Sequence, residues 1–383
     1  MKTIFDIKID FEKSKGSYVF DKNTNAYYLD FFNMYSTIPL GYNHPVFNKD
    51  FEKEVCDVCK FKMCNNVFQS EKIERFLTKF GKYCFSGNIH LTCTGSLAVE
   101  SAIKCALNHK KSKNPRIIAL KRGFHGLNGY GLLTDDYLDT RPRLEYLPRI
   151  DGWRNMELDN ILELLDTGYE NGFPSSLLNI AAIIIDPIQC AAGDIYLDKT
   201  KLQKLQKLCN KNDVCFIVDE VQTGFGATEK FWYSDVVGIK PDILVFGKKS
   251  QVSGIIASDK YNECFISTHQ KLEVTFDGEL IDIIRATYIL EFYEKIKPIN
   301  NKHFIKIKKI LDGKVKNIRG SGHLIAFDFD GRERRDDFFN KCLENKLLVN
   351  KGGGFSIRLR PNLALTNKEI NDFKKIFNKI ITK

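Results

Sequence analysis

Four short runs of consecutive apolar residues divide the middle of the chain. They cover residues 117–120, 181–185, 214–218 and 243–246. None alternates with polar residues, which is the pattern of strands buried on both faces of a parallel sheet. The segments between the runs have helical periodicity instead. Within 201–210, Leu202, Leu205 and Leu208 share one side of the expected helix and lysines occupy the other. This alternation predicts an α/β domain with right-handed crossovers.

The pattern changes after about residue 285. A long helical segment at 281–295 leads into a lysine-rich stretch, then into a strand-like run at 324–329 and further helix and strand. We expect a smaller α+β domain there. The lysines of 302–316 and 374–383 are spaced so that they can share one solvated helix face. A groove for nucleic acid would interleave aromatic residues with the basic ones, so we expect no nucleic-acid partner.

Composition narrows the class of protein. The chain has 383 residues, of which 43% are hydrophobic and 28% charged, as in an ordinary soluble globular protein. These values exclude a disordered chain, a collagen and a coiled coil. The net charge of +10 permits an acidic partner without requiring one. The longest apolar stretch, 180–185, is far shorter than the roughly 20 residues that cross a bilayer. Acidic residues interrupt the N-terminal segment where a secretory signal would be apolar, so we expect a cytoplasmic protein with no membrane partner.

The cysteines agree with a reducing compartment. Their number, eleven, is odd, and they are scattered through apolar and helical contexts. Cys56, Cys59 and Cys64 form the one close group. A structural zinc site needs four ligands, typically in two close pairs, and no second Cys-x-x-Cys occurs. We therefore expect free thiols and no metal.

Residues 92–96 (TCTGS) precede a helical pattern. Gly95 allows a tight turn, and Ser96 offers a hydroxyl and a backbone N–H at the expected helix N-terminus. This geometry binds an anion, typically a phosphate, although a glycine–serine pair before a helix also occurs as a simple cap.

Three further motifs follow expected strands. Asp219 opens DEVQTG at the carboxyl end of the 214–218 strand, where ligands bind in open α/β sheets. A carboxylate there can hold a pyridine nitrogen protonated, or it can simply cap a helix. Lys248, in FGKK after the 243–246 strand, could form a Schiff base if its pKa is lowered. Phe124, in GFHG at 123–126, could stack on a planar ring.

Together these motifs resemble those of the class III aminotransferases, the ornithine and ω-amino acid type within PLP fold type I. Within that family they are most similar to the L-lysine 6-aminotransferases. The resemblance covers almost the whole chain in order, through segments 12–18, 40–45, 92–96, 123–126, 186–189, 219–224, 246–251 and 357–361. It implies a large, mostly parallel-sheet PLP-binding domain at 41–285 and a smaller α+β domain at 286–383, which the N-terminal segment 1–40 joins.

The resemblance also implies roles for the residues that contact pyridoxal 5′-phosphate. Lys248 would bind the cofactor covalently and act as the catalytic base, while Lys249 would be a structural or surface neighbour. Asp219 would pair with the pyridine nitrogen and Gln222 would approach the ring oxygen. Gly95 and Ser96 would hold the phosphate, and Phe124 and His125 would lie at the ring. Asp186 and Gln189 would also contact the cofactor. Thr275 would reach the phosphate that is bound in the partner subunit. The active unit would thus be a homodimer.

The departures from the family concern the substrate. Family members usually read EPIQGEGG where this chain has DPIQCAAG at 186–193. Ala191 therefore replaces a glutamate that pairs with the substrate-binding arginine, here Arg358. Without that partner the pocket must be wetter, supply another acid or keep a carboxylate ligand close by. Leu127 replaces an arginine that grips the substrate carboxylate in the lysine-specific members, and leucine cannot donate a hydrogen bond.

We interpret the chain as a PLP-dependent aminotransferase. It would move an amino group between a terminal amine, such as L-lysine or a related biosynthetic amine, and a keto acid, with 2-oxoglutarate and glutamate as the expected pair. A PLP-dependent mutase or decarboxylase on the same fold is the first alternative. A non-catalytic scaffold dimer is the second, although the intact cofactor motifs argue against it.

Overall fold

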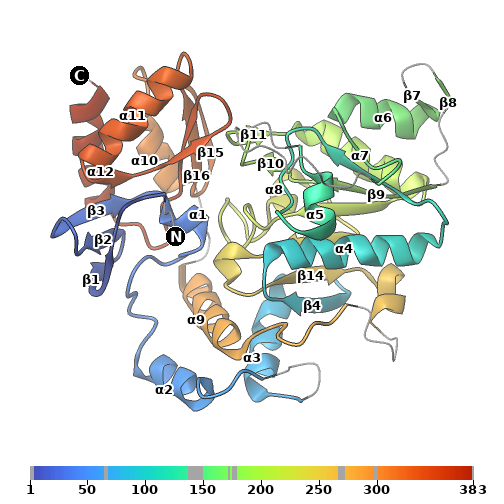
Figure 1. Cartoon of the computed structure of the whole chain (residues 1–383), viewed down its shortest axis with the longest axis horizontal. Coiled ribbons are helices and arrows are strands. Elements are labelled where there is room, and N and C mark those ends of the chain that lie inside the picture. The colour runs from blue at the N-terminus through green and yellow to red at the C-terminus, as the bar shows by residue number, and fades with distance from the viewer. Residues whose placement is uncertain are drawn as a thin grey trace.

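The computed structural model describes residues 4–63, 68–136, 150–170, 173–174, 179–265, 272–296 and 301–381. A seven-stranded sheet lies at the centre of the larger part of the molecule (Figure 1). In spatial order its strands are β4 (Asn88–Thr92), β14 (Ser253–Ala257), β13 (Ile243–Phe246), β12 (Cys215–Asp219), β9 (Ile180–Ile185), β5 (Arg116–Leu120) and β6 (Arg154–Met156). β14 runs antiparallel to both of its neighbours, and the other pairs are parallel. The predicted fold class and the four predicted strands are confirmed.

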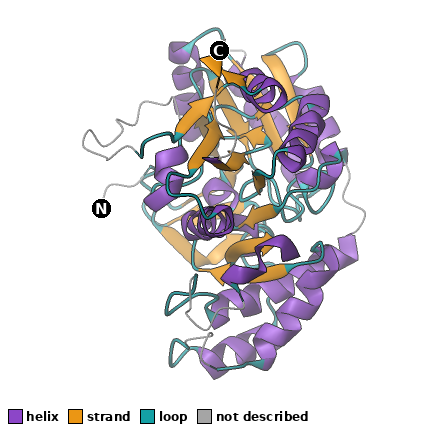
Figure 2. Ribbon diagram, turned by 90° about the vertical axis from the view of Figure 1, so that its right-hand side faces the viewer, coloured by secondary structure: helices purple, strands orange, loops and turns teal. Residues whose placement is uncertain are grey.

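Helices cover both faces of this sheet, which explains the unbroken apolar runs (Figure 2). In β12, Phe216 and Val218 pack on one face, where the covering helices are α6 (Leu158–Thr167), α7 (Lys199–Lys211) and α8 (Tyr233–Val237). Cys215 and Ile217 pack on the other face, against α4 (Gly95–Lys110) and the 3₁₀ helix η4 (Asp259–Cys264). A strand that buries successive residues on opposite faces leaves no position for a polar side chain.

Three helices pack together below the sheet in Figure 1: α2 (Lys49–Val58), α3 (Glu71–Phe80) and α9 (Leu280–Ile296). Arg75 of α3 links the other two, with ion pairs of 2.7 Å to Glu54 and 2.8 Å to Glu291. α9 confirms the helix predicted at 281–295 and runs without a break through residue 285, where we expected the large domain to end.

The smaller part combines both ends of the chain. A sheet of β15 (Lys316–Ser321), β16 (Leu324–Asp328), β19 (Ser356–Leu359) and β18 (Asn350–Gly352) carries α10 (Lys302–Leu311), α11 (Arg332–Glu344) and α12 (Asn367–Ile381). The N-terminal strands β1 (Ile9–Lys15), β2 (Tyr18–Asp21) and β3 (Ala26–Asp30) form a second sheet with β17 (Leu347–Leu348). Figure 1 shows these blue strands beside the orange and red C-terminal elements. Phe31 stacks on Phe373 of α12, with ring centroids 5.0 Å apart.

Shorter elements complete the described chain. They are α1 (Asn33–Ser36), η1 (Gly81–Tyr83), α5 (Gly129–Thr134), β7 (Tyr169–Glu170), β8 (Phe173–Pro174), β10 (Ile188–Gln189), β11 (Ile195–Tyr196) and η3 (Lys248–Ser250). All four residues of α1 have positive φ, between 44° and 73°, so this segment is a left-handed turn. The Asp30 carboxylate stabilises it by accepting hydrogen bonds from the backbone N–H groups of Phe32 and Asn33.

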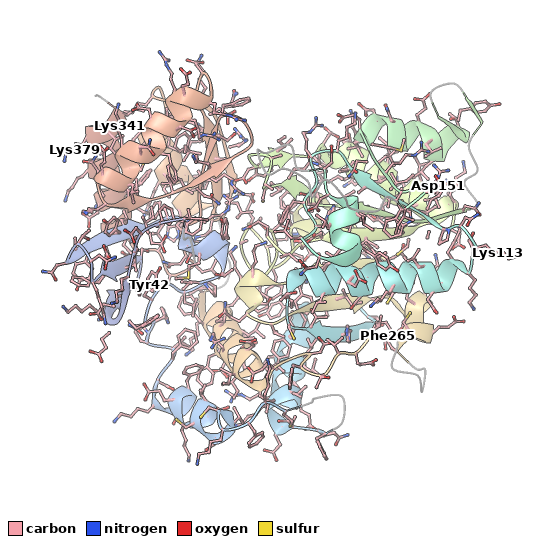
Figure 3. All side chains as sticks on the ribbon, in the orientation of Figure 1. Tyr42, Lys113, Asp151, Phe265, Lys341 and Lys379 are labelled. Atoms are coloured by element: carbon pink, nitrogen blue, oxygen red, sulfur yellow. The ribbon has the colours of Figure 1, made fainter. Side chains whose placement is uncertain are left out.

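The lysine-rich helices expose their charges as predicted. In α12, Phe373 and Phe377 are buried, whereas Lys374, Lys375 and Lys379 are exposed. Figure 3 shows Lys379 at the edge of the molecule. Within the described ranges, no helix is long and apolar enough to cross a membrane. The same ranges hold no group of three His, Cys, Asp or Glu side chains that could bind a metal, and Cys64 of the predicted cysteine group lies outside them.

Candidate active site

A cavity of about 470 Å³ opens at the carboxyl ends of the parallel strands. Four strands supply its walls in the same way, since a functional residue follows each one directly or after a short loop. His125 lies in the loop after β5, Asp186 follows β9, Asp219 ends β12 and Lys248 comes just after β13. The fold thus brings together residues that are more than 120 positions apart in the sequence.

One end of the cavity is formed by the N-terminus of α4. The Thr94 hydroxyl caps this helix by accepting a hydrogen bond from the Leu97 N–H at 3.3 Å. Gly95 and Ser96 line the cavity there. Gly126 has φ +122°, and a Cβ atom at this position would lie 2.3 Å from Ser96 Oγ, so only glycine lets the two loops approach so closely. Exposed backbone N–H groups at the start of a 16-residue helix fit a phosphate group.

The cavity wall also holds a fixed carboxylate. Asp219 Oδ2 lies 2.9 Å from His125 Nδ1, and Asp219 Oδ1 accepts a hydrogen bond from the Val221 N–H at 3.0 Å. Burial by itself would lower the pKa of His125. The hydrogen bond to Asp219 and its charge outweigh this effect and raise that pKa to about 9. His125 is therefore a cation at neutral pH, and its hydrogen bond fixes the Asp219 carboxyl group at the cavity, where a pyridine nitrogen could pair with it.

Of Asp186 and Gln189, only one faces the cavity. Asp186 lines the cavity, and its burial raises the pKa of its carboxyl group to about 8. Gln189 is buried, but its side-chain amide donates to the Lys121 carbonyl oxygen at 2.6 Å and lies outside the cavity wall. The sequence predicted a cofactor contact for both, and only Asp186 faces the cavity.

Of the two adjacent lysines, Lys248 lines the cavity and Lys249 does not. Lys248 has φ 56°, which turns the chain sharply after β13. Burial lowers the pKa of its ammonium group, and the charge of Asp219 opposes that shift. Lys249 is only 1% exposed, so it is not a surface residue.

Two further side chains suit a planar aromatic ligand. Phe124 lines the cavity from the loop after β5, where its ring can stack on another ring. Gln222 also lines the cavity, and its side-chain nitrogen is buried with no hydrogen-bond partner among the described residues. A buried donor without a partner is costly, which points to an acceptor on a ligand. The phosphate-binding helix end, the ring-facing carboxylate, the lysine and this donor together fit pyridoxal 5′-phosphate.

The substrate side of the cavity is formed by Arg358 of β19 and by Ala191. Arg358 is 7% exposed. Its guanidinium donates to the Cys190 carbonyl oxygen at 2.7 Å and to the Lys351 carbonyl oxygen at 2.9 Å. Backbone carbonyl groups therefore contact the arginine in a chain that lacks the family's glutamate at position 191.

Leu127 and Thr275 are not part of the cavity wall. Leu127 is 52% exposed, and Thr275 is exposed in the turn that follows Val274. A single chain therefore does not bring these two predicted residues to the cofactor side of the cavity. Arg360, in contrast, is fully buried in a two-point ion pair with Asp194, which makes it a structural anchor.

The sequence did not single out Tyr35 and Thr37, which line the cavity from the left-handed turn and the residues after it. The local pattern contains no signal for them, because their contribution depends on the N-terminal segment packing beside the large sheet. Ile188, Val221 and Thr223 also line the cavity. They lie inside or next to motifs that the sequence did identify, so proximity to those motifs was the available signal.

Comparison with known proteins gives the same assignment. The family model "Aminotransferase class-III" matches residues 3–381. The L-lysine-epsilon aminotransferase of Streptomyces clavuligerus is 29% identical, over 96% of this chain and 89% of that protein. The acetylornithine aminotransferase of Aquifex aeolicus is 27% identical, over 98% and 97% respectively. The solved structure "Lysine aminotransferase from M. tuberculosis in the internal aldimine form" superposes with a TM-score of 0.89 at 26% identity, covering 99% of this chain and 95% of that one. The chain belongs to the class III aminotransferases and is a PLP-dependent transaminase.

Proposed function

We propose that this protein transfers the amino group of a terminal (ω) amine to a keto acid, with 2-oxoglutarate as the acceptor. The observation that supports this most directly is that Lys248, Asp219 and Arg358 line one cavity. Pyridoxal 5′-phosphate, when bound, supplies the electron sink for the reaction. We assign the cofactor to the part of the chain between residues 41 and 285, and the substrate arginine to the part from 286 to 383 that residues 1–40 join.

Each residue that lines the cavity has a role set by its position. Lys248 binds the cofactor and moves the proton at the reacting carbon, and a lowered pKa gives its amine the free electron pair that both tasks need. Asp219 pairs with the ring nitrogen, and Gln222 donates to the ring oxygen. Gly95 and Ser96 hold the phosphate, while Phe124 stacks on the ring. Arg358 binds a carboxylate of the substrate.

L-lysine is the nearest named amine donor, since the relatives at 28–29% identity are L-lysine-epsilon aminotransferases. Leu127 and Ala191 differ from the lysine-specific pattern, so we also include a related biosynthetic amine of similar length. The carbonyl contacts of Arg358 keep its guanidinium at the cavity in place of a side-chain acid. A carboxylate-bearing acceptor can therefore bind without displacing a competing glutamate at 191.

We further propose a cytoplasmic homodimer in which Thr275 of each subunit reaches the phosphate site of the other. Thr275 is exposed between Val274 and Phe276, two apolar side chains that are 47% and 43% exposed. Exposed apolar residues gathered in one turn are typical of an interface. The ten cysteines within the described ranges are all free, in keeping with a reducing compartment.

The test is the absorbance of the purified protein. Bound cofactor should colour it yellow, and K248A should abolish both the band and turnover. K249M is the matched control, because Lys249 lies outside the cavity, and it should keep the band. A colourless wild-type protein that takes up no added cofactor would overturn the proposal and favour a scaffold role. Single amines should bleach the band if transamination occurs, whereas release of CO2 without bleaching would indicate a decarboxylase.

Donor specificity has its own test. Leu127 lies outside the cavity wall but directly follows Gly126, which lines it, so the longer arginine side chain of L127R can extend to the cavity. The double variant L127R/A191E restores the two charged side chains of the lysine-specific pattern and should raise kcat/KM for L-lysine by roughly tenfold, as expected when a charged hydrogen bond to a carboxylate is gained. Leu127→Gln with Ala191→Gln is the matched control, similar in polarity but without charge. If L127R/A191E leaves lysine turnover unchanged, these two positions do not set donor choice.

A further inference from the structure

Three titratable side chains meet beside the cofactor cavity. Asp186 follows β9 and Asp219 ends β12, and these parallel strands pair with Ile185 opposite Val218. The two carboxyl groups therefore emerge side by side at one edge of the sheet. His125 comes from the loop after β5 and contacts Asp219 through Nδ1 at 2.9 Å. All three residues are buried and line the cavity.

The far side of this group contains two orphaned polar atoms. Within the described part of the chain, His125 Nε2 and Asp186 Oδ1 are buried and have no hydrogen-bond partner. Both border the same space beside Gly123, where a Cβ atom would lie 3.1 Å from His125 Nε2 and 3.4 Å from Asp186 Oδ1. Glycine at this position keeps the space between the two atoms open. A buried donor and a buried acceptor each cost about 1–3 kcal/mol when unpaired, so their placement around one open space favours a bridging water molecule.

We propose that Asp186 is a positioning residue that acts on Asp219 through His125, by accepting a hydrogen bond from His125 Nε2 through one bridging water molecule. The inference rests on the proposed function, because it takes Asp219 to be the partner of the ring nitrogen. In this arrangement the imidazolium donates from both ring nitrogens, to Asp219 on one side and toward Asp186 on the other. The imidazolium ring is then held on both sides, and so is the orientation of the Asp219 carboxyl group.

The charges around the histidine agree with this arrangement. Three acids face it: Asp219 from β12, Asp186 from the end of β9 and Asp135 from the end of α5, which accepts a hydrogen bond from the His125 backbone N–H. Burial opposes the charge of His125, and these acids overcome it, giving the pKa of about 9. Asp186 has a pKa near 8, raised mainly by burial, so its carboxyl group is largely protonated at neutral pH. Between about pH 8 and pH 9 Asp186 is ionised while His125 still holds its proton, so the charge of Asp186 contributes to the raised pKa of His125.

The length of the acid is the feature particular to this chain. The resemblance gives glutamate at this position in other members, and Asp186 is shorter by one methylene. A glutamate would extend toward the gap beside Gly123, whereas aspartate leaves room for water. The variant D186N therefore tests whether the acidic group is needed, and D186E tests whether the length of the side chain matters.

The experiment measures the pKa of His125 by NMR in protein labelled at its histidines, in the cofactor-free state, with H125Q to assign the signal. D186N should lower the pKa of His125 by about one unit, a tenfold loss of proton affinity. D186E should retain a pKa at or above the wild-type value. D136N is the matched control, because Asp136 lies next to Asp135 but its carboxylate accepts from the Arg122 N–H instead. In the cofactor-loaded protein, the pH midpoint of the absorbance band should move in the same direction as the pKa of His125.

The NMR result tests the role of Asp186, and cofactor binding tests the proposed function. An unchanged His125 pKa in D186N, or an equal fall in D136N, overturns the role of Asp186 even when the protein binds its cofactor normally. A wild-type protein that binds no cofactor overturns the proposed function, whatever the NMR result. If D186N fails to fold, D186E keeps the test: a His125 pKa below the wild-type value in D186E would overturn the role of Asp186, because the carboxyl group is retained there.

Discussion

Lys249 shows how much one buried side chain can depend on pH. It is 1% exposed, and its amine has no hydrogen-bond partner among the described residues. Burial and the positive charges of Arg360 and Lys248 lower the pKa of this amine to about 7, against the opposing effect of Cys190 and Asp194. An unpaired ammonium is costly in such a place, so a largely neutral amine is the stable form near and above neutral pH.

We predict that K249M stabilises the protein, and does so most at low pH. An unfolded lysine has a pKa near 10.5, so between about pH 7 and pH 10.5 the unfolded state binds more protons than the folded state. Wild-type stability therefore falls by several kcal/mol as pH drops through this window and falls no further below it. Methionine has a similar shape and no charge, so the variant should lack this dependence. Urea unfolding midpoints at about pH 7 and pH 10 measure it.

The control for that prediction is K374M, which removes an exposed lysine from α12. It should leave the midpoint at both pH values close to wild type. If K249M behaves like K374M, then Lys249 is charged and paired in the folded protein, contrary to its environment here.

At the scale of elements, the loop of residues 190–194 joins the two parts of the molecule. Three arginines of the smaller part hold it. Arg360 forms the buried ion pair with Asp194, Arg358 donates to the Cys190 carbonyl oxygen, and Arg319 donates to the carbonyl oxygens of Gly193 and Asp194. The loop also accepts a backbone hydrogen bond from Gly353 at 3.1 Å. Because Arg358 is one of these anchors, the position of the substrate arginine depends on the same contacts.

We predict that D194N destabilises the protein by about 3–5 kcal/mol, because it leaves the Arg360 guanidinium buried without its counter-charge. It should also raise KM for the keto acid, since the loop that holds Arg358 loosens. The double variant D194N/R360M should recover part of the stability, because no unpaired charge remains. Denaturant unfolding and steady-state kinetics measure the two effects.

D198N is the matched control: Asp198 caps α7 at the surface, and asparagine caps helices equally well. Equal effects of D194N and D198N would contradict the anchoring role.

These elements also show what the sequence could and could not predict. The runs that became β5, β9, β12 and β13 were recognisable because burial on both faces requires apolar residues at every position. The antiparallel direction of β14 and the left-handed turn of α1 were not, since both follow from long-range packing. The motif DPIQ marked Gln189 as a cofactor contact, yet its amide is taken by the Lys121 carbonyl oxygen. A motif identifies a segment, whereas the direction of each side chain is set by the partners that tertiary structure supplies.

At the scale of the whole molecule, the cavity is assembled from both parts. The large sheet contributes the cofactor-facing residues, β19 of the smaller part contributes Arg358, and the N-terminal segment contributes Tyr35 and Thr37. The surplus positive charge lies mostly elsewhere, on exposed lysines such as those of α12, and is a poor guide to function. The shape of the cavity and a few buried side chains determine the chemistry instead.

The exposed turn around Thr275 gives the last prediction. Within this turn the Asp277 carboxylate accepts from the Val274 N–H at 2.9 Å, and the Cys93 thiol donates to the Phe276 carbonyl oxygen, also at 2.9 Å. The turn is therefore attached to the loop that begins α4, close to the phosphate end of the cavity. Lys62 covers one side of the Phe276 ring, 4.7 Å from its centroid, and the ring is still 43% exposed.

A second copy of this chain docking on the turn would bury Phe276 and bring Thr275 to the partner's phosphate site. We predict that F276D converts the proposed dimer to a monomer, because a carboxylate in an apolar interface loses its hydration without gaining a partner. The monomer should bind pyridoxal 5′-phosphate at least tenfold more weakly, which corresponds to about 1.4 kcal/mol for one lost phosphate contact. Sedimentation equilibrium and cofactor titration measure these outcomes.

The control is F11D, because Phe11 is 76% exposed on β1. The F11D variant should remain a dimer with normal cofactor affinity. A monomeric F276D that binds the cofactor as tightly as wild type would show that the phosphate site is complete within one chain.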